Sequence, residues 1–172
     1  MLALVREGEF SPGAEAVATR ADVGLRTVFR HFNDMDTLYR EMSSAIEAQL
    51  MSAVARPLRG ATWRERLIDL VDRRSNAFET IAPFRAAADL HRLRSPVLQE
   101  THARLNGFLR AVLVNELPDA PTGDAAARAD LLEGLDMLLS YEVWRRLRAD
   151  QGLDPDAARA VIVAAVRRLL NA

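Results

Sequence analysis

Two short helical segments joined by a tight turn lie near the start of the chain, and they constrain its fold more than any other feature. Ser11-Pro12 predicts a helix start, because serine can cap free backbone N–H groups and proline is tolerated at the first helical position. We expect this helix to end near Arg20, residues 21–24 to form the turn, and residues 25–32 to form the second helix. The residues expected to form their shared core are Val17, Ala18, Ala21, Val23, Val28 and Phe32. Such a pair of crossed helices, here spanning residues 16–32, is a helix-turn-helix.

Helical patterns continue to the end of the chain, so the predicted fold class is all-α. Asp34 is expected to cap a long helix from Met35 to about Ala55, and residues 56–60 predict a linker. Thr62 and Glu65 have capping-box spacing and open the next helix, which we expect Pro83 to break. Beyond it we expect a loop at residues 119–124 and helices at 84–93, from 95 to about 117, 125–149 and 155–170, the last capped by Asp154. Neither a strand pattern nor an internal repeat is present in the sequence.

Composition narrows the class of protein further. The chain has no cysteine, which excludes disulfides and thiol catalysis and fits a reducing compartment. It shows neither an apolar run of membrane-spanning length nor a signal-peptide pattern, so we expect a cytoplasmic protein that does not enter the membrane. The net charge is −1, and the 23 positive residues are all arginine. Any contact with DNA must therefore come from a local surface rather than from overall charge.

The second helix of the helix-turn-helix carries side chains suited to a DNA major groove. Arginine can bond guanine through two hydrogen bonds, threonine can contact a thymine methyl group or a phosphate, and histidine can reach a phosphate. The residues free to face the groove are Leu25, Arg26, Thr27, Arg30 and His31.

The stretch from Ala21 to Phe32 resembles the signature of the TetR family of transcriptional regulators. The sequence ADVGLRTVFRHF follows the pattern Ala-Gly-Val-Ser-x-x-Thr-Leu-Tyr-x-His-Phe, and Asp36-x-Leu38 at the start of the long helix also fits. The resemblance covers about a quarter of the chain, and it implies base or phosphate contacts at Leu25, Arg26, Thr27, Phe29 and His31. The sequence departs from the family at Phe29 (usually tyrosine), Met35 (often lysine), Glu15 (often basic or neutral) and Gly24 (usually a serine cap).

The resemblance also implies an architecture and a function. Residues 1–42 would form a three-helix DNA-binding domain, and residues 43–172 a helical domain for ligand binding and dimerisation. The chain begins inside the family's first helix, so we expect that native N-terminal residues are missing. A dimer would bind palindromic operator DNA, usually as a repressor, and a small-molecule inducer would release it.

The helical body offers candidates for the inducer site and for the dimer interface. Polar or aromatic residues that interrupt apolar stripes are the candidate ligand contacts: Phe78, Phe84, His91, His102, Asn106, Met137 and Tyr141. Because few charged positions lie on these stripes, we expect a small and largely apolar effector, with neither a cofactor nor a metal ion. The last two helices are apolar on more than one face, as Leu135 and Val166 illustrate, which indicates pairing with a second copy.

Two alternatives from other classes remain open. One is a helical ligand-binding or adaptor protein whose DNA binding has weakened, which the even charge balance of residues 11–40 and Phe29 would allow. The other is a small helical enzyme. The three histidines are scattered, and the sequence lacks both a nucleophile-elbow serine and a glycine-rich phosphate loop, so we expect no enzyme.

Overall fold

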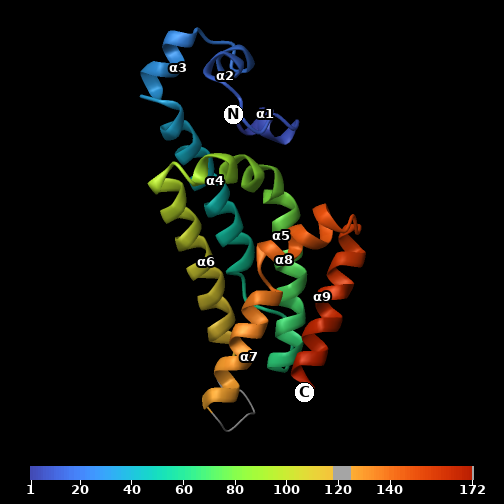
Figure 1. Ribbon diagram of the computed structural model, residues 1–172. Coiled ribbons are helices and arrows are strands. Elements are labelled where there is room, and N and C mark those ends of the chain that lie inside the picture. The colour runs from blue at the N-terminus through green and yellow to red at the C-terminus, as the bar shows by residue number, and fades with distance from the viewer. Residues whose placement is uncertain (118–124, 172) are drawn as a thin grey trace. The chain divides into compact units, whose positions relative to one another are not determined.

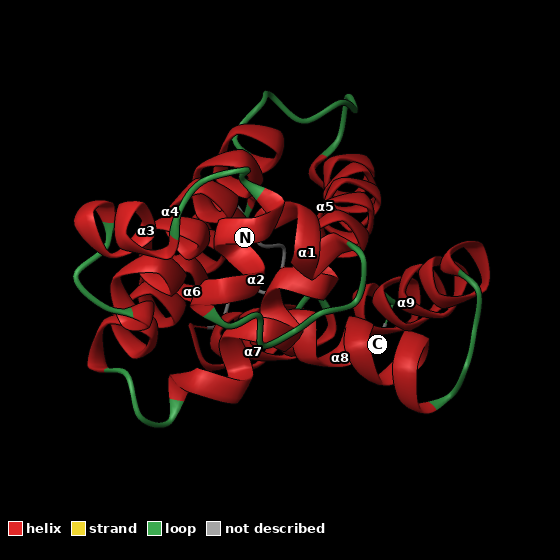
Figure 2. Ribbon diagram, turned by 90° about the horizontal axis from the view of Figure 1, so that it is seen from above, coloured by secondary structure: helices red, strands yellow, loops and turns green. Residues whose placement is uncertain are grey.

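The computed structural model describes residues 1–117 and 125–171, and the loop expected at 119–124 lies outside this part. In the described residues every regular element is a helix and no strand occurs, which confirms the all-α class (Figure 2). Contacts divide the chain into two compact units. Unit 1 comprises residues 1–51 and 81–106, and unit 2 comprises residues 52–80 and 107–172.

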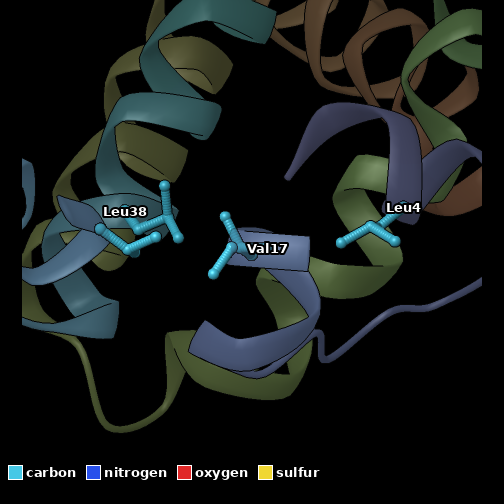
Figure 3. Close-up of a cluster of buried hydrophobic side chains, with 5 residues drawn as sticks. Leu4, Val17 and Leu38 are labelled. Atoms are coloured by element: carbon cyan, nitrogen blue, oxygen red, sulfur yellow. The ribbon is translucent and has the colours of Figure 1, made fainter. Parts of the chain in front are cut away.

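Unit 1 contains the helix-turn-helix, which is formed by α2 (Ala14–Arg20) and α3 (Leu25–His31) (Figure 1). Its core joins these helices to α1 (Leu2–Arg6) and to the start of α4. Figure 3 shows Val17 between Leu38 of α4 and Leu4 of α1. The buried residues of this cluster are Leu4, Val17, Ala18, Val28 and Leu38.

Three details of the predicted helix-turn-helix were wrong. The helix α2 begins after Gly13, without a side-chain cap, so Ser11 does not cap it. Ala21 and Val23 are exposed rather than in the core, because both lie in or at the edge of the turn between α2 and α3. Phe32 packs against the cluster but is only partly buried, and Leu4 and Leu38 are buried members of the cluster that the prediction did not include.

The long helix α4 (Met35–Val54) starts where the sequence predicted. The Asp34 carboxylate accepts a hydrogen bond from the backbone N–H of Thr37 at 2.7 Å, which confirms the predicted cap. This bond also lowers the pKa of Asp34. The buried face of α4 repeats at helical spacing and includes Leu38, Met42, Ile46 and Leu50, so one helix carries both the helix-turn-helix core and the interior of unit 1.

The next helix, α5 (Trp63–Arg92), was predicted to end at Pro83 but continues through it. Its start is the expected capping box, in which Glu65 N–H donates to Thr62 Oγ1 at 3.3 Å and the Glu65 carboxylate accepts from the backbone of Thr62 at 3.0 Å. Proline inside a helix costs about 3 kcal/mol. The buried Ile81 and Phe84 flank Pro83, and their burial offsets that cost.

Unit 2 contains the last part of α6 (Pro96–Glu116) together with α7 (Ala125–Leu138), α8 (Tyr141–Arg145), a π-helical turn (Arg146–Asp150) and α9 (Pro155–Leu170). A single helix over 125–149 was predicted, but the chain breaks after Leu138. Ser140 caps α8 by accepting from the Val143 N–H at 3.3 Å. The buried Arg74 donates to the carbonyl of Leu139 at 3.0 Å, which satisfies an acceptor that a continuous helix would have used.

The start of α9 follows the prediction. Asp154 caps the helix by accepting from the Ala157 N–H at 2.8 Å, and Pro155 occupies the first turn. None of the helices in the described ranges has the length and apolar character needed to cross a membrane.

Candidate nucleic-acid interface and ligand cleft

The orientation of α3 is set by the turn that precedes it. The Val23 N–H donates to the Ala18 carbonyl at 3.0 Å, and Asp22 adopts a left-handed backbone conformation with φ of 52°. Aspartate tolerates this conformation better than most residues. Gly24 is extended, with φ of −69° and ψ of 148°, and α3 starts directly after it. Only one residue of α3, Val28, is buried, so the helix presents most of its circumference to solvent.

The six residues predicted to contact DNA lie on α3, and five of them are exposed. Leu25 is 39% exposed and Phe29 is 47% exposed, while Arg26, Arg30 and His31 are also exposed and Thr27 is partly buried. Residues four apart on a helix are neighbours on its surface. Arg26 and Arg30 therefore form one row opposite Val28, and Leu25 and Phe29 form a second row beside it.

The charges on α3 are available to a partner. Within the described residues, the structure shows no ion pair for Arg26 or Arg30, although neighbouring arginines are engaged. Arg20 of α2 pairs with Glu7, and Arg40 of α4 lies 3.6 Å from Asp36. The acidic side chains near the helix-turn-helix are therefore partly neutralised by other arginines, and the outward face of α3 keeps its positive charge.

Unit 1 also contains a cleft between α4, the last part of α5 and the first part of α6. The cleft is partly open to solvent, and the space that it encloses is small, about 40 Å³. Its walls are mainly apolar: Ile46, Ile81, Phe84, Leu98 and Leu105. At its edge, the buried Glu47 accepts two hydrogen bonds from Arg104, at 2.8 and 2.6 Å.

Of the predicted ligand residues, the structure brings Phe84 and His102 into this cleft, and Asn106 lies beside it with its amide 3.0 Å from the His102 ring. His91 is elsewhere in unit 1, against the Tyr39 ring at 4.1 Å between centroids. Two others, Phe78 and Tyr141, contact each other in unit 2, with ring centroids 5.6 Å apart.

The sequence analysis missed six polar or charged residues that line the cleft: Ser43, Glu47, Arg85, Asp89, Arg92 and Thr101. The sequence did contain an indication for Glu47. This residue follows Ser43 by four positions and lies beside the apolar stripe of α4, where a carboxylate is partly buried and therefore needs a partner. That partner, Arg104, lies far along the sequence on α6, so the pairing could not be predicted.

In the last two helices, the residues that are exposed to a possible second copy are not the ones that illustrated the prediction. Leu135 and Val166 are fully buried within their own chain, where α7 and α9 pack so closely that a Cβ atom on Gly134 would lie 3.0 Å from the Leu169 side chain. Met137 of α7 and Val161 of α9 are the large apolar side chains exposed on these helices, at 62% and 46%. Met137, which was predicted as a ligand contact, therefore lies on the surface of its own chain.

Among residues 1–117 and 125–171, no group of three or more histidine, cysteine, aspartate or glutamate side chains is arranged to hold a metal ion.

Comparison with solved structures identifies the fold. A transcriptional regulator from Rhodococcus sp. Rha1 superimposes with a TM-score of 0.72 at 19% identity, covering 98% of this chain and 90% of that one. The TetR family transcriptional regulator PfmR from Thermus thermophilus superimposes with a TM-score of 0.63 at 19% identity, covering 98% and 93%. No family model matches the sequence, and no curated protein matches it. The chain thus has the fold of TetR-type regulators over nearly its whole length.

Proposed function

We propose that this chain is a transcriptional regulator of the TetR family, acting as a repressor, and that α3 binds the major groove of operator DNA. The observation that carries the proposal is the outward surface of α3, where Arg26, Arg30 and His31 are exposed on a helix-turn-helix. A second helix of this kind enters the major groove and contacts base edges. On this proposal residues 1–42 are the DNA-binding domain and residues 43–172 the regulatory domain.

The test is a comparison of DNA affinity between two double variants of equal charge. Duplexes that the protein binds are selected from a random pool, and affinity is then measured by fluorescence anisotropy at fixed salt. Arg26→Ala/Arg30→Ala should lower affinity by about thirtyfold or more, because each guanine contact contributes about 1–3 kcal/mol. The control Arg94→Ala/Arg146→Ala removes two exposed arginines from other surfaces and should bind nearly as well as the wild type. Equal losses in both variants would contradict a binding site on α3.

The operator should be palindromic, because we propose that two copies pair through α7 and α9. The exposed Met137 and Val161 provide apolar surface on these helices. Light scattering should report about twice the chain mass of 19.1 kDa. Val161→Glu or Met137→Glu should shift the protein towards monomer without unfolding it, whereas a monomeric wild type would contradict the proposal.

The effector site that we propose is the cleft of unit 1. Its apolar walls favour a small, largely apolar molecule. The α4 residues Ser43, Ile46 and Glu47 line the cleft, and α4 begins only four residues after α3 ends, so a ligand there would contact the helix that carries the helix-turn-helix.

A matched pair of variants tests the cleft. Ala88 lines it, whereas Ala86 on the same helix is exposed. Compounds that raise the melting temperature of the wild type are first found by thermal-shift screening. Ala88→Leu should abolish that shift by filling the cleft, and Ala86→Leu should preserve it. A shift that survives Ala88→Leu would place the ligand elsewhere.

A further inference from the structure

The outward face of α3 has an apolar row that DNA binding by arginine does not explain. Leu25 and Phe29 are four residues apart and lie beside the row formed by Arg26 and Arg30. They are 39% and 47% exposed, and Val23 in the preceding turn is 40% exposed. Large apolar side chains therefore share with two arginines the surface that would face the base pairs.

The chemistry of the major groove restricts what these side chains can contact. The thymine C5-methyl group is the apolar group that a standard base pair presents there, and the remaining base-edge groups are hydrogen-bond donors or acceptors. If Leu25 or Phe29 covered a donor or acceptor, it would exclude water without replacing the hydrogen bond, which would weaken binding. An apolar side chain facing a methyl group carries no such cost.

We infer that Leu25 and Phe29 read thymine methyl groups in the operator and so determine part of its sequence. This inference rests on the proposed function. The two residues are separated by about 6 Å along the helix axis, because an α-helix rises 1.5 Å per residue. Base pairs are stacked about 3.4 Å apart. Each half-site should therefore carry two thymines within about two base pairs of each other, next to the position contacted by the arginine row.

The test replaces thymine by deoxyuridine, which removes the methyl group and leaves base pairing unchanged. Each thymine of a selected duplex is replaced in turn, and the affinity of the full-length protein is measured by fluorescence anisotropy. At two positions in each half-site the replacement should weaken binding about fourfold, the factor expected from burying one methyl-sized group. At the other thymines it should have no effect.

Side-chain variants assign each methyl group to its residue. Leu25→Ala should lose sensitivity to one of the two replacements and keep the other, and Phe29→Ala should do the opposite. Arg26→Ala is the matched control: it should bind more weakly yet respond to both replacements as the wild type does. Since Leu25 and Phe29 are exposed, circular dichroism should show both variants folded, and the measurement on the wild type stands even if one variant does not fold.

The outcomes separate this inference from the proposed function. If no duplex can be selected and no salt-dependent DNA binding is seen, both fail. If DNA binds but deoxyuridine has no effect at any position, only the thymine inference is overturned. If the effect persists in both Leu25→Ala and Phe29→Ala, another residue such as Thr27 contacts the methyl groups, and the assignment is wrong.

Discussion

The surface of α3 and the cluster of Glu79, Trp144 and Arg148 in unit 2 use arginine in opposite ways. In the cluster, Arg148 donates to both oxygens of Glu79 at 2.7 and 3.0 Å, and Trp144 Nε1 donates to the same carboxylate at 2.9 Å. On α3, Arg26 and Arg30 form no ion pair within the described residues. The residue type is the same in both places, so the difference lies in what surrounds it. Arg148 pairs with a carboxylate of its own chain and so stabilises the fold, whereas the arginines of α3 have no such pair among the described residues and can bind a partner.

The two regions also differ in how much of each helix is buried. α3 contributes Val28 alone to a core, whereas α9 contributes Ala158, Ile162 and Val166. A helix that keeps most of its surface for a ligand has little left for packing, so its stability depends on a few neighbours. We therefore expect substitutions to have local effects in the helix-turn-helix and broad effects in unit 2.

The largest effect is expected from Trp144→Ala. The ring is 1% exposed, and its removal leaves a large cavity and takes one hydrogen bond from Glu79. The free energy of unfolding should fall by about 3–5 kcal/mol, measured by urea titration with circular dichroism. Trp63→Ala is the control, because Trp63 is only partly buried at the start of α5. Equal losses of unfolding free energy in the two variants would show that the deeper burial of Trp144 does not determine how much its removal destabilises the protein.

Leu38→Ala should give the next largest effect, a loss of about 2–5 kcal/mol. Leu38 joins α4 to the helix-turn-helix core, which has few other members. Hydrogen exchange should therefore show lost protection in α2 and α3 and retained protection in α9. The control Leu25→Ala, at an exposed position, should change stability by no more than about 0.5 kcal/mol. Uniform loss of protection along the chain would contradict the local character proposed for this core.

Glu79→Gln should produce a smaller, pH-dependent effect. The hydrogen bonds from Arg148, and secondarily that from Trp144, lower the pKa of Glu79 although burial opposes them. Because the folded pKa lies below the unfolded value, the stabilisation is present above about pH 4.5 and is lost as the pH falls through the folded pKa. The difference in stability between wild type and Glu79→Gln should be about 1 kcal/mol at pH 7 and should shrink towards pH 3.

The control for this variant is Glu41→Gln. Glu41 is exposed on α4 and makes no ion pair among the described residues. Its substitution should leave the pH profile unchanged. A Glu79→Gln difference that stays constant from pH 7 to pH 3 would mean that the ion pair does not contribute to stability.

The same two regions show which features could be predicted from the sequence. The helices of the helix-turn-helix, the Asp34 cap and the exposed residues of α3 follow from local signals, and they were predicted to within a few residues. Pro83 was predicted to end a helix because proline removes a backbone hydrogen bond, yet α5 continues through it. Ile81 and Phe84, on either side of Pro83, are buried. The break before Ser140 contains neither glycine nor proline, and one of its carbonyls is satisfied by Arg74, which is distant in sequence.

The ligand residues show the same limit. The sequence pattern selected aromatic and polar residues of the body helices as candidate ligand contacts. It could not assign Phe84 and His102 to one cleft and Phe78 and Tyr141 to another unit. That assignment depends on contacts between helices, which periodicity does not encode.

The smallest expected effect concerns the start of α3 and compares it directly with the start of α9. Gly24 and Asp154 precede their helices with nearly the same backbone, φ and ψ of −69° and 148° against −68° and 165°, but only Asp154 supplies a side-chain cap. A Cβ atom on Gly24 would meet no atom within 4 Å, so Gly24→Ser should fit without strain.

Gly24→Ser should raise the free energy of unfolding by a few tenths of a kcal/mol, the usual difference between serine and glycine at a cap. The gain is small because the Thr27 N–H, which the new hydroxyl would accept from, already donates to the Gly24 carbonyl at 2.8 Å. By contrast, Asp154→Ala should cost about 1 kcal/mol, because it removes the 2.8 Å bond to the Ala157 N–H. Urea titrations of both variants measure the two changes. A loss of stability in Gly24→Ser would show that serine does not fit this backbone as a cap. A gain as large as the Asp154→Ala loss would show that the bond from the Thr27 N–H to the Gly24 carbonyl does not reduce the benefit of a side-chain cap.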